Sequence, residues 1–443
     1  MSQQSNQHLE IVPSNVTSDG KLSFKNGQPV IQFIIGEQQR YLLGQTLRLV
    51  GQFKVLNGDG ALGSANANLN MDGRTSLYST IDQLVIKSQA TNQTIEHIRD
   101  YNRFMSSYLS ATNDLNDGLT FNNAQSLQVL NSKAIKEGVV DNAKSLHDNT
   151  MTFCLSLPCG LLNGSPPIPL ARDWGVGGLI LEIHLSPDNN VLYSEDGVGT
   201  NIANAFYEYQ KVALICEVQT PAPSDLAQLQ KTAGQGETFE YNSISSYYTT
   251  FNSTNAIINF SLGLSRVLSV FCNFITSSHI NNRSFNGMTT YYPKRKDDKV
   301  AKILQVIFTR GGERMPLEYN IDSVQKQSAD NSFPDSQIYR NYVNAIQSFV
   351  KNTRSLNCPE NMLVDLGAKA PKDSYNKFID GGAGVGVGVA FDTISNQGID
   401  FRTTQFGLQM DTELLDDNPQ SVYMFVKSKQ TMVFNSQGIQ IIT

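Results

Sequence analysis

The sequence predicts an all-β protein with a few short helices, built as two antiparallel sandwiches in tandem. Many short apolar stretches alternate with polar residues at a period of two, which is the spacing of a half-buried strand. Turn signals separate these stretches, among them six Asp-Gly steps. About one helical stretch occurs in each half, which favours antiparallel sheets over a fold whose helices connect parallel strands.

A plan of strand, turn, strand and helix occurs twice. In each copy an apolar strand meets a polar turn, a second strand opens with an aliphatic-Glu pair, and a helical segment carries Tyr. The first copy consists of residues 81–86, 94–98 and 100–104, and the second of residues 303–308, 316–319 and 338–342. The repetition predicts one chain built twice on the same plan.

The length supports two domains, because 443 residues exceed the size at which one core keeps growing. The best linker is the polar stretch after Thr220-Pro-Ala-Pro-Ser224, and it sets the boundary. The expected divisions are an N-terminal flexible or docking arm (1–28), a first sandwich (29–219), a linker (220–236), and a second sandwich with the C-terminal tail (237–443).

Strands are expected in order along the first half. The clearest are residues 41–56, which end at an Asn-Gly turn, and residues 178–186, where Leu or Ile alternates with Glu182 and His184. The other expected strands are 30–35, 81–86, 94–98, 151–157 and 206–218, with a helix at 98–109 and a long excursion at 110–148 that we expect to carry contacts.

The second half repeats this style. Residues 334–350 form the clearest expected helix, with apolar residues at helical spacing and a proline near its start. The expected strands are 257–260, 267–275, 303–308, 317–319, 389–394, 401–410, 421–426 and 432–442. Residues 239–251, which are aromatic and rich in Ser and Thr, and residues 375–379 continue the same style.

Charge and cysteine content exclude several classes of function. The net charge is -6 and only 17% of residues are charged, so the chain is not built to neutralise phosphates, and a surface this poor in charge is compatible with contacts between copies. The five cysteines form no CxxC pair, which predicts free thiols rather than disulfides or a zinc site. The first residues lack a signal-peptide pattern, so we expect a soluble protein that is not secreted.

No motif for catalysis, a cofactor or a metal is found. The glycine run at 381–389 fails the GxGxxG spacing and is better explained as a strand whose glycine face packs closely against another backbone. The histidines are scattered without metal-ligand spacing: His8, His97, His147, His184 and His279. We therefore expect no catalytic, cofactor-binding or metal-binding residues.

Four polar groups have structural explanations. Glu182 and His184 lie on one face of a strand and suggest a hydrogen bond at a rim rather than an acid-base couple, whereas Glu96 and His97 point to opposite faces. Asp416-Asp417 suggests a turn. The basic cluster of residues 294–302 is diluted by Asp297 and Asp298 and suggests a charged surface loop.

The repeated plan, together with three short motifs, resembles a known family. The motifs are Leu157-Pro-Cys-Gly-Leu-Leu162, Ile168-Pro-Leu170 and Leu181-Glu-Ile-His-Leu-Ser186. Over residues 30–435 the chain resembles the double jelly-roll major capsid proteins of icosahedral double-stranded DNA viruses, with polinton-like viruses and virophages as the nearest look-alikes.

The resemblance implies two tandem eight-stranded jelly rolls, standing upright on the capsid floor, and a homotrimer that forms a pseudo-hexagonal capsomer. It also implies a place in the virion, assembly in the cytoplasm or nucleus of a host cell, and contacts with neighbouring capsomers, penton proteins and minor capsid proteins. No enzyme activity and no specific nucleic-acid binding are expected.

Two other functions stay open on the sequence alone. One is a β-sandwich adhesin or fibre protein, which glycan binding would support. The other is a glycan-active enzyme on a β-sandwich, which would need two carboxylates about 5–10 Å apart in one cleft.

Overall fold

The structure of the chain is a computed structural model, and it describes most of the chain. The described residues are 6–16, 21–22, 29–56, 71–72, 75–112, 151–164, 166–193, 205–288, 303–315, 321–322, 336–349, 386–391, 397–412, 415, 417–435 and 438–443. The predictions for residues 110–148 (beyond residue 112), 294–302, 316–319, 375–379 and 381–385, and for His147, Cys358 and Asp416, lie outside these residues.

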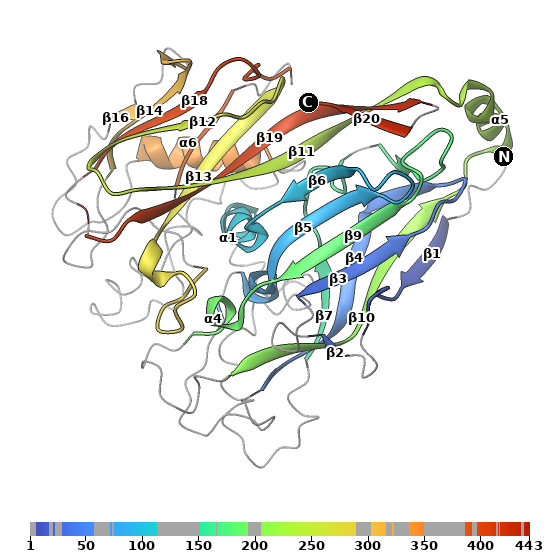
Figure 1. Cartoon of the computed structure of the whole chain (residues 1–443), viewed down its shortest axis with the longest axis horizontal. Helices are drawn as coiled ribbons and strands as arrows, with labels where there is room; N and C mark the ends of the chain where they lie inside the picture. The colour runs from blue at the N-terminus through green and yellow to red at the C-terminus, as the bar shows by residue number, and fades with distance from the viewer. Residues whose placement is uncertain are drawn as a thin grey trace.

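Two antiparallel sheets face each other in the first half (Figure 1). One sheet contains, in spatial order, β1 (Asn6–Ile11), β10 (Phe206–Gln219), β4 (Tyr41–Leu56) and β7 (Met151–Ser156). The other contains β3 (Val30–Ile35), β9 (Leu179–Leu185), β5 (Ile81–Ser88) and β6 (Thr94–Ile98). The two-residue strands β2 (Lys21–Leu22) and β8 (Ile168–Pro169) pair with β10 and β4.

The second half contains two further sheets. One has the order β11 (Gln235–Phe251), β19 (Gln420–Asn435), β13 (Val267–Thr276) and β17 (Gly386–Ala390), and β20 (Gly438–Ile442) also pairs with β19. The other has the order β12 (Asn255–Phe260), β18 (Phe406–Thr412), β14 (Ile303–Arg310) and β15 (Glu313–Arg314), and β16 (Ile321–Asp322) also pairs with β14.

The two halves share one topology. When the strands of each half are numbered along the chain without β2, β8, β16 and β20, the sheets read 1-8-3-6 and 2-7-4-5 in both halves. This order wraps two Greek keys around one core, which is the jelly-roll arrangement. The predicted fold class, two tandem jelly rolls with a few helices, is therefore confirmed.

Helices occupy equivalent places in the two rolls. Helix α1 (Tyr101–Thr112) and helix α6 (Ser336–Gln347) each lie between the fifth and sixth strands. Along the chain, α5 (Pro223–Thr232) connects the last strand of the first roll to the first strand of the second, and it has no buried residue. The remaining helical turns are η1 (Ser76–Thr80), α4 (Asp188–Val191) and η4 (Ser277–His279). The repeated plan seen in the sequence thus corresponds to equivalent strands β5 and β14, each followed by a helix.

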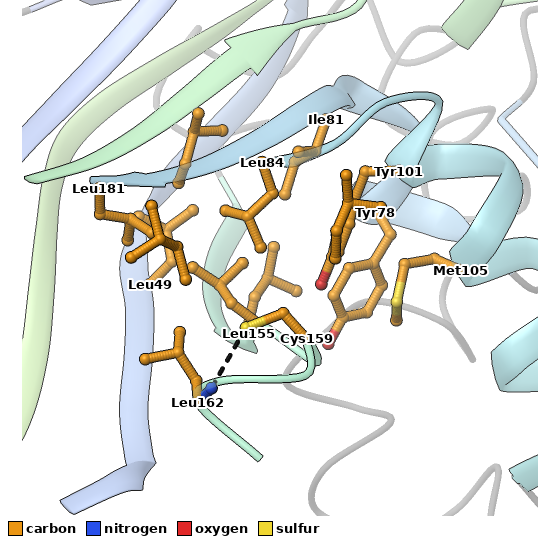
Figure 2. Packing of buried hydrophobic residues seen from close by; sticks show 14 of the residues in the cluster. Leu49, Tyr78, Ile81, Leu84, Tyr101, Met105, Leu155, Cys159, Leu162 and Leu181 are labelled. Carbon is orange, nitrogen blue, oxygen red and sulfur yellow. Dashed lines mark hydrogen bonds between the residues drawn. The ribbon is translucent and has the colours of Figure 1, made fainter. Parts of the chain in front are cut away.

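Alternation of side chains between the core and the outer face builds each sandwich. On β9 every second residue from Leu179 to Leu185 is buried, as the sequence predicts. In the first roll, Leu49, Leu84 and Leu181 from both sheets pack with Leu155 (Figure 2). Burying a leucine contributes about 1.5–3 kcal/mol to the free energy of unfolding relative to leaving it exposed. These buried leucines therefore hold the two sheets together.

Several predicted boundaries were wrong. The strand expected at 401–410 begins at Phe406 as β18, and the strand expected at 389–394 is β17, which ends at Ala390. Three further cases are explained by strand pairing. Residues 6–11, expected in a polar arm, form β1 and pair along their whole length with β10. The two strands expected between 421 and 442 with a break after 426 are one long strand, β19, followed by β20, because β19 pairs with β11 from residue 420 to residue 435. The helix expected from Ile98 begins at Tyr101, since Ile98 still pairs with Leu84 in the sheet.

Candidate functional site

The candidate functional site is the buried contact between the two rolls, which we call the junction. One apolar cluster contains residues of both rolls, whereas a second cluster lies within the second roll alone. Helix α1 and strand β6 supply the junction from the first roll, and β11, β13, β19 and α6 supply it from the second (Figure 1). The rolls are therefore joined by a shared core.

Phe104 of α1 is the central side chain of the junction. It is fully buried, and its ring centroid lies 6.1 Å from that of Phe271, 5.9 Å from that of Phe349 and 5.5 Å from that of Phe425. These three partners belong to the second roll. Aromatic pairs at such distances contribute about 0.5–1.5 kcal/mol each beyond the burial of their area, so one side chain of the first roll anchors the second.

Glu96 of β6 makes the main polar connection. Its carboxylate accepts backbone N–H groups from Gly160 at 2.9 Å, Leu161 at 2.9 Å and, across the junction, Ile244 at 2.7 Å. The side chain is 3% exposed. Burial raises the pKa of Glu96, and the three backbone donors oppose that rise.

The loop that binds Glu96 comes from the motif Leu157-Pro-Cys-Gly-Leu-Leu162. A Cβ atom at Gly160 would lie 2.3 Å from the carbonyl oxygen of Asn242 on β11, so only glycine lets this loop meet the second roll. Cys159 is buried beside Glu96, and its sulfur accepts the N–H of Leu162 at 3.4 Å (Figure 2). The motif therefore shapes the junction.

A buried arginine crosses the same contact. Arg103 is 1% exposed, its Nη2 donates to Oδ1 of Asn190 at 3.3 Å, and its guanidinium carbon lies 5.2 Å from the ring centroid of Tyr423 on β19. Its backbone carbonyl accepts Nδ2 of Asn273 on β13 at 3.2 Å. Helix α1 is thus held to two strands of the second roll by polar as well as apolar contacts.

The start of α1 carries a perturbed carboxyl. Burial raises the pKa of Asp100 to about 6, repulsion from Asp82 adds to the rise, and Arg103 and Arg99 oppose it. Burial likewise raises the pKa of Asp82. Asp100 also has a left-handed backbone conformation, with φ 53°. Burial therefore disfavours the charged form of both carboxyls.

A second connection comes from residues 277–288, which follow β13 and reach the first roll. Nη2 of Arg283 donates to the carbonyl oxygen of Ala205 at 2.8 Å, and Nδ2 of Asn286 donates to Asp72 at 2.7 Å. Two separate contacts between the rolls resist a hinge motion.

The glycine strand packs closely against a helix, which refines the prediction of close backbone approach. On β17, a Cβ atom at Gly388 would lie 2.7 Å from the Cβ of Ala345, and one at Gly386 would lie 2.8 Å from the ring of Tyr342. Both neighbours belong to α6, and Gly386 would also clash with the carbonyl oxygen of Cys272 at 2.0 Å. The described part of the glycine run therefore lets α6 pack closely against β17.

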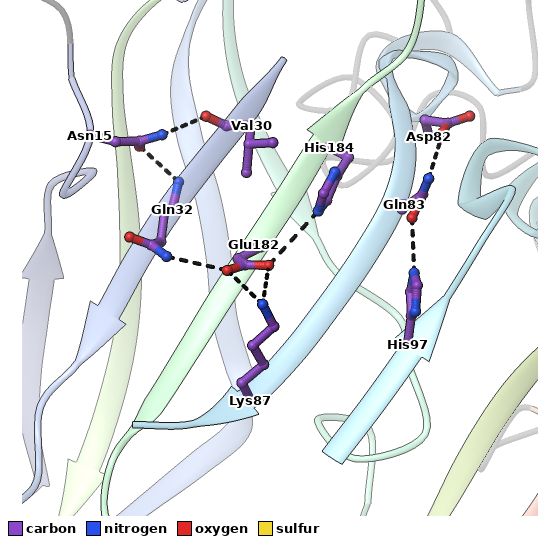
Figure 3. A network of polar contacts seen from close by, with 9 residues as sticks. All are labelled: Asn15, Val30, Gln32, Asp82, Gln83, Lys87, His97, Glu182 and His184. Carbon is purple, nitrogen blue, oxygen red and sulfur yellow. Dashed lines mark hydrogen bonds and ion pairs between the residues drawn. The ribbon is translucent and has the colours of Figure 1, made fainter. Parts of the chain in front are cut away.

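The predicted Glu182–His184 pair lies on the outer face of the first roll (Figure 3). The two side chains share a face, as expected, but Nε2 of His184 lies 3.8 Å from the carboxylate, so the predicted hydrogen bond does not form. Glu182 pairs instead with Nζ of Lys87 at 2.8 Å and accepts Nε2 of Gln32 at 3.2 Å. Although burial acts to raise the pKa of Glu182, these bonds and charges outweigh it and lower the pKa.

The other predicted residues remain apart. His97 bonds to Gln83 at 2.9 Å on the outer face, while Glu96 points inward. Four of the five cysteines are described, and all four are free thiols: Cys154, Cys159, Cys216 and Cys272. Within the described residues, no group of three His, Cys, Asp or Glu side chains is placed to hold a metal ion. None of the helices in that part of the chain is long and apolar enough to cross a membrane.

Sequence reasoning singled out Glu96, and it included Arg103 in the repeated stretch 100–104, but it assigned a role to neither, and it did not single out Asn273. The available signal for Glu96 was its place in the repeated aliphatic-Glu pair. Both members of that pair, Ile95 and Glu96, are buried, because β6 has the sheet on one side and the second roll on the other.

Comparisons by sequence give no match: neither a protein-family model nor a curated protein matches the chain. Comparison of structures does. The Faustovirus major capsid protein matches with a TM-score of 0.58 at 7% identity, over 98% of this chain and 91% of that chain. The PBCV-1 virus capsid matches with a TM-score of 0.53 at 10% identity, over 100% of this chain and 97% of that chain. A chain of the Sputnik virophage structure matches with a TM-score of 0.50 at 12% identity, over 99% of this chain and 88% of that chain.

These likenesses extend over most of each chain, so they include both rolls. At such low identity they show the fold. The chain therefore has the double jelly-roll fold found in the capsid structures of Faustovirus, PBCV-1 and the Sputnik virophage.

Proposed function

We propose that this chain is the major capsid protein of an icosahedral double-stranded DNA virus and that it forms homotrimeric, pseudo-hexagonal capsomers. The observation that carries the proposal is the pair of jelly rolls with one strand order, joined by a shared buried junction. The proposal is also supported by the structural match to the Faustovirus major capsid protein, which covers 91% of that chain.

The geometry suits this role for a physical reason. Three copies of a chain related by threefold symmetry present six similar sides if each copy contributes two similar rolls. The six sides stay in register only if the two rolls of a chain keep a fixed angle. The junction, with its buried Phe104 and Glu96, provides such a constraint.

The proposed division of the chain follows the predicted boundaries (29–219, 220–236 and 237–443), with two changes. The first roll also takes β1 and β2, and the linker ends at residue 234 because β11 of the second roll begins at Gln235. In support, no strand of the described chain pairs across the linker, which contains the surface helix α5.

The work of such a protein lies in its contacts, and we assign it no catalysis. Its proposed partners are two further copies in the capsomer, neighbouring capsomers, and penton and minor capsid proteins, with no specific nucleic-acid binding. The proposed location is the virion, after assembly in the cytoplasm or nucleus of a host cell.

Electron microscopy of the purified protein tests this proposal. We expect class averages with threefold symmetry and a six-sided outline. Particles the size of one chain, with two lobes and no symmetry at any concentration, would contradict the proposal. Binding of such particles to a glycan array would then favour the adhesin alternative.

A further inference from the structure

Strand β12 is an edge strand with an exposed apolar side chain. It pairs with β18 over its six residues without a register shift, and no other described strand pairs with it. Its outward residues are Asn255, Ile257 and Asn259, and Ile257 is 70% exposed. A straight edge of this kind presents unpaired backbone groups to other chains.

The usual protection of an edge strand is missing from β12. Residues 241–265, which include β12 and most of β11, contain no Asp, Glu, Lys or Arg and no Pro. Proteins commonly block such edges with charged side chains, prolines or bulges. The absence of all three over 25 residues leaves this edge able to accept another strand.

The first roll shows how the equivalent edge is covered. Strand β3 is the second strand of its roll, as β12 is of the second roll, and residues 14 and 15 pair with its free edge. The N–H of Ser14 donates to the carbonyl of Gln32 at 2.7 Å. The Asn15 side chain donates to the carbonyl of Val30 at 2.7 Å and accepts the N–H of Gln32 at 3.0 Å (Figure 3).

No described segment makes the corresponding bonds to β12. The connection between the first and second strands is residues 12–29 in the first roll but only residues 252–254 in the second, too short to run back along the edge of β12. The two halves thus share a fold but differ at this edge. The difference leaves the edge of β12 uncovered by the described residues.

We infer that β12 pairs antiparallel with β12 of a second copy of this chain, across a twofold axis at Ile257. In this register Ile257 lies opposite the partner's Ile257, and Asn255 lies opposite the partner's Asn259. The strand is self-complementary, since no like charges meet and the most exposed apolar side chain covers its own counterpart. The placement of this contact between capsomers rests on the proposed function; the strand pairing itself needs only a second copy.

The pairing is weak on its own. Two six-residue strands bury far less than the roughly 1,000 Å² that a stable interface needs. Many such contacts in one assembly act together, because after the first one forms the others are intramolecular. We therefore expect the pair to form at high protein concentration or within a shell.

Disulfide trapping tests the inference. In the variant Ile257→Cys, oxidation at high concentration should produce a cross-linked dimer, and peptide mapping should find the bond between two copies of residue 257. The matched control is Leu304→Cys, since Leu304 is 47% exposed on β14 of the same sheet but away from the edge. Wild type sets the background from its own thiols, three of which are buried and one half-buried among the four described.

The variant Ile257→Lys gives a second, independent measurement by light scattering. We expect it to keep the trimer and to lose all larger assemblies, whereas Leu304→Lys keeps both. Larger assemblies that persist in Ile257→Lys would overturn the pairing.

The outcomes separate the inference from the proposed function. Trimers without a cross-link at residue 257 would overturn the strand pairing and leave the capsid proposal standing. Cross-linked dimers without any trimer would support the pairing and contradict the capsomer. A strict monomer without a cross-link would overturn both.

Discussion

The carboxylate of Glu96, on strand β6 of the first roll, accepts a hydrogen bond of 2.7 Å from the backbone N–H of Ile244, on strand β11 of the second. The same carboxylate binds two N–H groups of the loop after β7. Three segments distant in sequence therefore meet at one buried acid.

The variant Glu96→Gln should destabilise the protein by about 2–4 kcal/mol. The amide NH₂ would face backbone N–H donors, leaving at least one buried donor unsatisfied, which costs about 1–3 kcal/mol for each group. The measurement is urea denaturation with hydrogen exchange at Ile244 and Gly160. His97→Gln, a change at the neighbouring residue on the outer face, is the control and should cost less than about 1 kcal/mol. Equal stability of the two variants would contradict the role of Glu96.

The variant Gly388→Ala should destabilise the second roll by about 1–3 kcal/mol, since the new methyl group would lie 2.7 Å from the Cβ of Ala345 and force α6 away from β17. Gly36→Ala is the control, because nothing lies within 4 Å of a Cβ atom at that position. Thermal melting compares the two. A neutral Gly388→Ala would show that α6 does not depend on the glycine strand.

The variant Phe104→Ala should cost about 3–5 kcal/mol, because it leaves a cavity among Phe271, Phe349 and Phe425. The loss should appear as weaker coupling of the two rolls, measured by calorimetry as two separate transitions for the variant and, as we expect, a single transition for wild type. A single transition with an unchanged midpoint would argue against a shared core. Tyr248→Ala, at a side chain that is 53% exposed, should leave the single transition in place.

The pKa of Asp100 predicts a pH dependence of stability. Its value of about 6 in the folded chain lies above the ordinary 3.8, so the folded state holds the proton more tightly than the unfolded state. The stabilisation from this carboxyl is therefore full below about pH 4 and is lost as pH rises through 6, by at most about 3 kcal/mol.

The variant Asp100→Asn should remove this loss, since Asn also tolerates the left-handed backbone at this position. Melting temperatures at pH 4, 5, 6 and 7 provide the measurement. We expect the variant to gain stability over wild type as pH rises from 4 to 7. Parallel pH profiles for the two proteins would contradict the burial of this carboxyl.

Much of the fold was predictable because a strand with one buried face has apolar residues at every second position of the sequence. Strand β9 and helix α6 show this plainly, and so does the repetition of β5 and α1 as β14 and α6. Strand β1 was missed because four of its six residues are exposed and polar. The continuity of β19 was missed because Lys427 and Lys429 interrupt its apolar residues.

Those two lysines fit within β19 because of partners that the sequence does not show. Nζ of Lys429 pairs with Glu240 at 2.6 Å, and Nζ of Lys427 donates to the carbonyl of Ser348 beyond α6. Burial lowers the pKa of Lys427 to about 8. The junction was equally hidden, since no local pattern distinguishes a Glu that binds a second domain from one that faces water.

The mass of the purified protein in solution, measured by light scattering across a range of concentrations, tests the capsid proposal most directly. We predict a stable species with three times the mass of the 443-residue chain. A mass equal to one chain at every concentration would contradict the proposal that this double jelly roll builds a capsid.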